Sequence, residues 1–262
     1  PAVGAAAAAS PQHDLRRTPG IPVKRSALHP RYELAQEDAV MRDLVPRLRA
    51  LALLAKSAGM GLNIDAEEAD RLALSLEVID TVMGEPALAG WDGFGIVVQA
   101  YGPRAGVVID TLYDMAQRHD RRIRVRLVKG ADWDTEIKRA QVEGIDGFPV
   151  FTHKAATDVS YIANARKLLG MTDRIYPQFA THNAHTVAAV LHMADDPEAH
   201  EFQRLHGMGD TLHDIVMLTP GPPSRTTTEV YPDSPRVTSE QCNAAQAAAV
   251  CAAIDYGLTH SQ

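Results

Sequence analysis

The sequence predicts an α/β protein with a parallel β-sheet. Between residues 21 and 217, short apolar runs alternate with segments of helical periodicity, and six such units in 197 residues take about 33 residues each. This alternation is typical of parallel strands joined by right-handed crossover helices. The 262 residues suit one large domain, since an α/β barrel takes roughly 250 residues. The pattern alone is compatible with an open doubly wound sheet and with a barrel.

The six predicted strands are the apolar runs at residues 21–26, 61–65, 95–100, 124–129, 175–181 and 201–206. The helix after the first strand has its apolar residues spaced by three and four between Val40 and Ala52. Pro46 is expected to bend this helix or to begin a new first turn. Later helices are predicted at residues 69–83, 104–119, 133–142, 158–169 and 184–194, with a short one near 212–217.

The two ends of the chain lack this alternation. Residues 1–20 are interpreted as a linker or tail, residues 21–217 as the α/β domain, and residues 218–262 as a second tail. Residues 219–234 are rich in Pro, Thr and Ser and are expected to be irregular. An alanine-rich helix is predicted at 239–256, with Ser239 as its N-cap and Gly257 as its stop.

Composition excludes several classes of protein. With 26 basic and 33 acidic residues the net charge is −7, so no nucleic-acid partner is expected. Cys242 and Cys251 lie nine residues apart, on opposite faces of the predicted helix, which argues against a disulfide framework and for a reducing compartment. The sequence has no apolar run of membrane-spanning length, no secretory signal and no Gly-x-Gly-x-x-Gly after a strand.

Polar side chains lie at or near the carboxyl end of each predicted strand. In a parallel sheet these ends lie on one face, where α/β proteins bind their ligands, so we expect one shared site. The residues concerned are Lys24, Asp65, Gln99, Arg126, Lys129, Thr181, His182, Gln203 and His206.

Alternation along the strands separates two faces of the sheet. Lys24, Asn63, Asp65, Val97, Gln99, Arg126 and Val128 share one face, and Val23, Ile64, Val98 and Leu127 share the face that packs under helices. Arg25 interrupts the second set, so its guanidinium is expected to reach solvent or a partner.

Two short motifs have ligand-binding readings. His182 and His185, with His206, give a weak metal-site pattern that competes with chance spacing. Residues 129–131 (KGA), at a strand-to-helix turn, form either an anion cradle or an ordinary turn, and residues 207–209 (GMG) have the same two readings.

Several long motifs resemble the proline dehydrogenase domain of bacterial bifunctional proline utilization A flavoenzymes. They are residues 26–32 (SALHPRY), 64–68 (IDAEE), 99–101 (QAY), 126–131 (RLVKGA), 133–141 (WDTEIKRAQ), 176–185 (YPQFATHNAH) and 201–209 (EFQRLHGMG). The resemblance extends from about residue 20 to 216.

The resemblance implies a (β/α)8 barrel that binds FAD at the carboxyl ends of its strands. The implied reaction is oxidation of L-proline to Δ1-pyrroline-5-carboxylate, with hydride passing to flavin N5 and electrons to a quinone. It also implies a cytoplasmic protein with peripheral association at the inner face of the membrane.

The resemblance also implies roles for individual residues. Lys24, Asp65 and Arg126 are the expected catalytic residues, and Lys24, Asp65, Ala131 and Leu205 would contact the substrate. The expected FAD contacts are Asp65, Ala66, Val97, Gln99, Arg126, Val128, Lys129, Gly130, Ala131, Trp133, Thr152, Lys154, Thr181, His182, Asn183, Gln203 and Leu205. Gln99 and Asn183 have a competing reading as caps, and Trp133 as core.

Some positions depart from the family pattern. Asp132 stands where the family has tyrosine, Arg25 where it has leucine, and Gly102-Pro103 replace a longer polar pair. The family's first and last barrel strands are unmatched, and no Arg-Arg pair of the kind that grips the proline carboxylate follows residue 122. We therefore expect an incomplete barrel of about six strands, self-association through open edges, and impaired activity.

Two alternatives to an active proline dehydrogenase stay open at this point. One is a catalytically inactive remnant of the family. The other is a metal-dependent barrel lyase or hydrolase that uses His182 and His206.

Overall fold

Seven parallel strands form one sheet in which the strand order follows the chain, β1 to β7. The strands are β1 (Gly20–Val23), β2 (Gly61–Ile64), β3 (Phe94–Gln99), β4 (Ile123–Val128), β5 (Ile175–Ala180), β6 (Glu201–Leu205) and β7 (Ser224–Thr227). The computed structural model describes residues 15, 20–205, 208–209, 211–212, 214, 216 and 224–227. A doubly wound sheet reverses its strand order at a switch point, so the unreversed order selects the barrel-type alternative.

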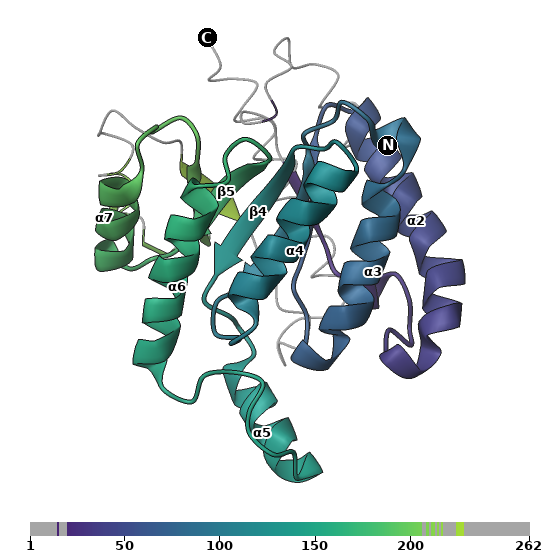
Figure 1. The fold of residues 1–262 in the computed structure, drawn as a ribbon, viewed down its shortest axis with the longest axis horizontal. Helices are drawn as coiled ribbons and strands as arrows, with labels where there is room; N and C mark the ends of the chain where they lie inside the picture. The colour runs from purple at the N-terminus through teal and green to yellow at the C-terminus, as the bar shows by residue number, and fades with distance from the viewer. Residues whose placement is uncertain are drawn as a thin grey trace, which may run out of the picture.

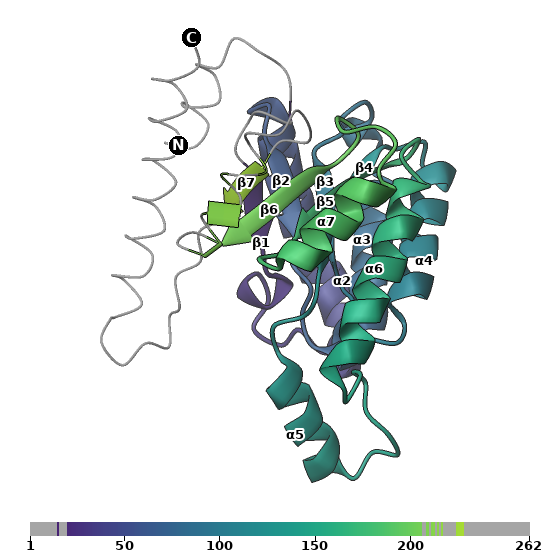
Figure 2. The ribbon, with the colours of Figure 1, turned by 90° about the vertical axis from the view of Figure 1, so that its left-hand side faces the viewer.

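The helices lie on one face of this sheet. Figures 1 and 2 show α2 (Glu37–Ser57), α3 (Leu72–Met83), α4 (Ala105–Arg118), α6 (Lys154–Leu169) and α7 (Ala184–Met193) side by side over that face. Helix α5 (Trp133–Glu143) projects away from the rest of the domain in both views. One-sided cover is what successive right-handed crossovers in chain order produce.

Two predicted boundaries are wrong in detail, and one of the two alternatives at Pro46 is excluded. Helix α2 is continuous through Pro46, so no new first turn begins there. Strand β1 ends at Val23, because the chain turns into a 3-10 helix at Arg25 that Glu67 and the Asp65 carbonyl hold in place. Helix α6 begins at Lys154, four residues before the predicted start, since its first turn reads Lys-Ala-Ala-Thr and has no large apolar side chain to mark a helical period.

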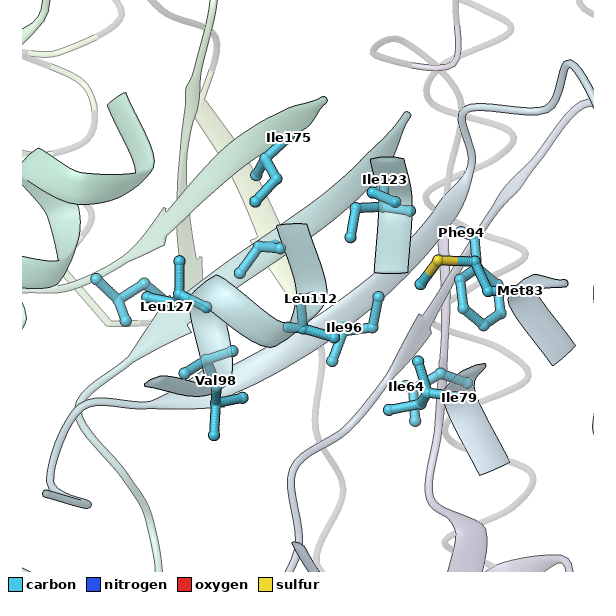
Figure 3. Close-up of a cluster of buried hydrophobic side chains, with 14 of the residues drawn as sticks. Ile64, Ile79, Met83, Phe94, Ile96, Val98, Leu112, Ile123, Leu127 and Ile175 are labelled. Carbon is cyan, nitrogen blue, oxygen red and sulfur yellow. The ribbon is translucent and has the colours of Figure 1, made fainter. Parts of the chain in front are cut away.

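The side chains between sheet and helices form the hydrophobic core. Residues that alternate along β2, β3 and β4 point to the helix side, and Figure 3 shows Ile64, Val98 and Leu127 there beside residues of α3 and α4. Each of these side chains is buried, as the alternation predicts, and Val23 packs partly buried against the same core. Burial of such aliphatic side chains stabilises the fold by about 1.5–3 kcal/mol each.

The opposite face of the sheet is the inside of a curl. Nδ2 of Asn63 on β2 donates a hydrogen bond to Oε1 of Gln178 on β5 at 3.2 Å. Three strand spacings separate β2 from β5, about 14 Å in a flat sheet, which is more than the two side chains can bridge. The sheet must therefore bend around its inner face, and the fold is a curled α/β sheet of the barrel type.

Strand β7 corrects the prediction that residues 219–234 are irregular. Ser224–Thr227 pair with β6 in parallel, with Arg225 in register with Gln203. The segment reads Ser-Arg-Thr-Thr, which has strand-favouring threonines but no apolar alternation, so the sequence pattern could not show it. The predicted short helix near 212–217 agrees with the helical residues Thr211, Leu212, Asp214 and Val216. The predicted helix at 239–256, with both cysteines, lies outside the described residues.

Within the described residues, none of the helices combines the length and the apolar character that a membrane crossing requires.

Candidate active site

The carboxyl ends of the strands bring most of the predicted site residues to one edge. Lys24 and Asp65 directly follow the register pair Val23–Ile64, and Asp65 N–H donates to the Val23 carbonyl at 3.0 Å. The strand pairing places two rows of residues across the inner face of the sheet. One row consists of the register neighbours Val97, Arg126, Gln178 and Glu201. The next row towards the carboxyl ends pairs Gln99 with Val128. Lys24 is exposed, whereas Asp65, Val97, Gln99, Arg126 and Val128 are partly buried, so this edge has both an open side and a lined floor.

Below this edge, the interior contains a chain of buried polar side chains. Asn63 donates to Gln178, and Nε2 of Gln178 donates to Oε1 of Glu201 at 2.7 Å. Nε2 of Gln203 donates to the same oxygen at 2.7 Å. Gly95 makes room for the chain, because a Cβ there would lie 1.8 Å from Oδ1 of Asn63.

Sequence reasoning assigned no role to Gln178 and Glu201. A usable signal was present, since both are polar residues on the inner face of strands whose alternate positions carry Phe179 and Phe202.

The predicted anion cradle at Lys129, Gly130 and Ala131 is a turn built on Tyr101. Tyr101 N–H donates to the Lys129 carbonyl at 2.8 Å, and Phe151 N–H donates to the Tyr101 carbonyl at 2.8 Å. Gly130 has φ +131°, and a Cβ there would lie 2.3 Å from the Tyr101 ring, so only glycine fits. Burial raises the pKa of the Tyr101 phenol, which therefore stays neutral.

Two lysines expected at the cofactor meet on one carboxylate. Nζ of Lys129 lies 2.5 Å from Oδ1 of Asp158, and Nζ of Lys154 lies 2.8 Å from Oδ2. The hydrogen bond from Lys129, followed by that from Lys154, lowers the pKa of Asp158. The pair joins the end of β4 to the start of α6 and gathers two cations at the site.

Three more of the expected cofactor contacts, Trp133, Ala131 and Thr152, lie at the surface near Lys129 and Lys154. Trp133 is 38% exposed and its indole Nε1 donates to the Phe151 carbonyl at 2.7 Å, so it is not core packing. Ala131 and Thr152 are exposed. All three are therefore accessible to a ligand.

The end of β5 is tied to β6 through His182. Leu205 N–H donates to Nε2 of His182 at 3.0 Å, and Thr181 N–H donates to the Gln203 carbonyl at 3.2 Å. Asn183 is the N-cap of α7, since its Oδ1 accepts from Thr186 N–H at 2.9 Å. The structure thus gives Asn183 the capping role that competed with ligand contact.

The metal reading gains no support from this geometry. Nε2 of His182 is engaged with the Leu205 amide, and His206 lies outside the described residues. Among the residues that the structure describes, no three His, Cys, Asp or Glu side chains gather as a metal site would require. Gly209, with φ +65°, packs beside His182 as part of a turn.

Arg25 finds a partner, as the sequence required. It is 2% exposed; its guanidinium donates to the Asp65 carbonyl at 3.0 Å and lies 3.4 Å from Glu67 and 5.4 Å from the centre of the Tyr32 ring. These contacts hold the loop that carries Asp65 and Ala66.

The same loop is fixed at two more points. Ala69 N–H donates to Oε1 of Glu136 on α5 at 2.7 Å, and Nε2 of Gln99 donates to the Glu67 carbonyl at 3.1 Å. Burial raises the pKa of Glu136. The side-chain amide of Gln99 thus caps this loop, so Gln99, like Asn183, has the capping role that the sequence allowed.

A cavity of about 70 Å³ lies behind this loop, between α3, α4 and the sheet, lined by Ala66, Glu67, Leu76, Val97 and Tyr101 among others. Ligand pockets usually measure about 300–1,000 Å³, so this cavity is too small for a dinucleotide. The candidate site is therefore the open inner edge of the sheet.

Comparison with known proteins agrees with this fold. A family model described as proline dehydrogenase matches residues 2–242, which extends the expected resemblance at both ends. The bifunctional protein PutA of Salmonella typhimurium is 56% identical over 218 residues, 82% of this chain and 16% of that protein. PutA of Escherichia coli K12 is 54% identical over 218 residues, with the same two shares. The chain therefore spans about a sixth of the length of these curated relatives.

Solved structures give the same result. A crystal structure of a bifunctional PutA protein superposes with a TM-score of 0.81 at 52% identity, covering 86% of this chain and 24% of that one. A mutant of Bradyrhizobium japonicum PutA gives a TM-score of 0.78 at 54% identity, covering 80% of this chain and 22% of that one. With a family model over most of its length and relatives above half identity, this chain belongs to the proline dehydrogenase family, as the domain of that kind found in PutA proteins.

Proposed function

We propose that this chain is an FAD-dependent proline dehydrogenase domain that oxidises L-proline to Δ1-pyrroline-5-carboxylate and passes the electrons to a quinone. The observation that supports this most directly is the inner edge of the sheet. There, acidic, basic and amide side chains from β2, β3, β4 and β6 stand together on the face away from the helices.

The residues present fit an FAD molecule. Lys129 and Lys154 supply two cations within reach of one carboxylate, a charge pattern suited to a diphosphate. Gln203 brings a buried amide whose Oε1 accepts no hydrogen bond from the described residues. When bound, FAD would supply the two-electron acceptor of the reaction.

Each part of the edge then has a proposed role. Lys129, Lys154 and Thr152 would hold the diphosphate and distal half of the cofactor, and Trp133 would cover it. The flavin ring would be lined by Ala66, Val97, Gln99, Val128, Gly130, Ala131, Thr181, His182, Asn183, Gln203 and Leu205. Arg126, in the middle of the row, would stabilise negative charge that builds up on the reduced ring.

Lys24 and Asp65 would face L-proline. Lys24 offers a charge to the substrate carboxylate, but an ammonium lacks the planar fork that matches both carboxylate oxygens. No adjacent arginine pair follows residue 122 in these 262 residues. We therefore expect proline to be held loosely and the turnover to be low, with a loss of roughly 2–5 kcal/mol in transition-state binding.

The proposed partners follow from the family. Transfer of electrons to a quinone would bring a cytoplasmic protein to the inner face of the membrane. Strands β1 and β7 are the outer strands of the described sheet, and unpaired edges favour self-association. Light scattering with and without vesicles would measure both kinds of association.

The decisive experiment is anaerobic stopped-flow mixing of the FAD-loaded chain with saturating L-proline. Visible absorbance first reports whether FAD binds, which separates a flavoprotein from a remnant that has lost the cofactor. We expect flavin bleaching much slower than about 10 per second, a typical turnover for enzymes. Bleaching at that rate would contradict the impairment, and an R225A variant would then show whether β7 supplies the missing guanidinium. Bound zinc in place of flavin would favour the metal-dependent alternative.

A further inference from the structure

The buried polar side chains inside the curl form a chain of hydrogen bonds, and Glu201 determines which atoms of that chain donate and which accept. A carboxylate only accepts hydrogen bonds, whereas a carboxamide can donate from one end and accept at the other. Gln178 and Gln203 both donate through Nε2 to Oε1 of Glu201, at 2.7 Å each. Glu201 is 0% exposed, so water cannot take the place of either amide.

The orientation of each amide then decides what its oxygen does. Oε1 of Gln178 points to Asn63 and accepts from its Nδ2 at 3.2 Å. Oε1 of Gln203 is buried as well, and it accepts no hydrogen bond from the residues that the structure describes. Of two amides held by one carboxylate, one oxygen is used inside the protein and the other is left as an acceptor.

We propose that Glu201 is a positioning residue that fixes the Gln203 carboxamide so that Oε1 is offered to a ring N–H of the ligand bound at the carboxyl edge. Gln203 follows Glu201 by two residues on β6 and is in register with Ala180 and Arg225. It therefore lies on the same face as Glu201 and nearer to the carboxyl edge of the sheet. This inference deepens the proposed function, from which it takes the flavin as ligand; the oxidised flavin ring has one such N–H donor.

A purely structural role does not explain this arrangement. A buried acceptor without a donor is unfavourable, and native proteins leave few of them. An aliphatic side chain at position 203 would fill the space without that cost. An amide at position 203 becomes favourable when a bound ligand supplies the hydrogen-bond donor that Oε1 lacks.

The test compares FAD affinity among four full-length chains: wild type, E201Q, Q203L and the double variant. In E201Q the new amide can donate as well as accept, so the direction of the chain is no longer enforced. We expect each single variant to raise the Kd for FAD by about 5- to 10-fold, the equivalent of one hydrogen bond. The double variant should lose no more than either single one, because both changes remove the same contact. D80N, which alters a carboxylate on α3 away from the site, should leave the Kd unchanged.

A second readout needs no cofactor. Exchange of the glutamine side-chain amide protons, followed by NMR in the apo chain, should be slow for Gln178 and Gln203 and become fast in E201Q. Unchanged protection in E201Q, a Kd within twofold of wild type, or losses that add in the double variant would overturn the proposal. If wild-type chain binds no FAD, the proposed function and the ligand part of this inference both fail. The amide exchange then still decides whether Glu201 sets the orientation.

Discussion

Both faces of this sheet are buried, but one is covered by apolar packing and the other carries buried polar side chains. On the face under the helices, the strands present Ile64, Val98, Leu127 and Phe179, packed among aliphatic side chains of α3 and α4 and aromatic neighbours. On the inner face β2, β4, β5 and β6 present Asn63, Arg124, Gln178, Glu201 and Gln203, each also buried. Because successive side chains of a strand point to opposite faces, neighbouring residues of one strand belong to different sets.

The difference shows where stability and specificity reside. Apolar packing is non-directional and tolerates repacking if volume is kept. A buried polar chain requires every partner in place and in one orientation, so it fixes geometry more than it adds stability. The outer face is therefore expected to determine the free energy of unfolding, and the inner face the properties of the site.

The largest expected effect comes from the outer face. Phe179 lies in an aromatic cluster with Phe202 at 6.2 Å and His200 at 5.7 Å between ring centroids. Phe179→Ala should lower the free energy of unfolding by about 3–5 kcal/mol in urea denaturation, because the cavity cannot collapse fully. Val159→Ala on the exposed side of α6, where Val159 is 69% exposed, is the control and should change it by less than about 0.5 kcal/mol. A loss near that of the control would contradict the assignment of stability to this face.

The next effect comes from the inner face alone. Gly95→Ala places a methyl group 1.8 Å from Oδ1 of Asn63, so the amide must move. We expect a loss of about 1–3 kcal/mol in the free energy of unfolding. Gly170→Ala meets ordinary contacts and should be near neutral. In an Asn63→Ala background the cost of Gly95→Ala should largely disappear, and an undiminished cost would show that the crowding has another source.

A smaller effect is the pH dependence of the outer face. Burial lowers the pKa of His200 below 6.5, although the Asp196 carbonyl, Asp196 and Glu201 oppose this. The folded chain therefore binds this proton less readily than the unfolded chain, so stability is full above pH 6.5 and falls as the pH drops towards the folded pKa. Thermal melts at pH 7.5 and 5.5 should show a smaller decrease in Tm for His200→Phe than for wild type. His192→Gln, at an exposed position on α7, should behave as wild type does.

The smallest expected effect concerns Asp132. This exposed carboxylate precedes α5 beside the Lys129 turn and is one of the charges that raise the pKa of Tyr101. If FAD binds where proposed, Asp132→Tyr removes a negative charge near the group that gains electrons and adds an aromatic surface, so FAD should bind about 2- to 10-fold more tightly. Asp134→Tyr removes the same charge one position into α5 and serves as the matched control. Equal gains in both variants would mean that charge alone acts, and no gain would count against the placement of this turn at the cofactor.

Part of the candidate site was predictable because strand ends are marked in the sequence. Lys24, Asp65 and Gln99 each follow or end an apolar run, Arg126 lies two residues before the end of its strand, and the parallel order brings such ends together. The start of α6 and strand β7 were not predictable, since the residues there carry no apolar period. Arg25 could be flagged from sequence as needing a partner, but its partner Glu67 lies 42 residues away.

The sequence by itself determined the order of strands and helices, the two faces of each strand and the family motifs, because these depend on residues close together in the chain. Only the tertiary structure decided what meets across the curl. Asn63 and Gln178 are 115 residues apart, and they touch because the sheet bends and Gly95 leaves space between them. The pairing of Lys129 and Lys154 on Asp158 and the shared oxygen of Glu201 have the same origin. Such contacts depend on the curvature of the sheet and on close packing, which no local pattern of residues encodes.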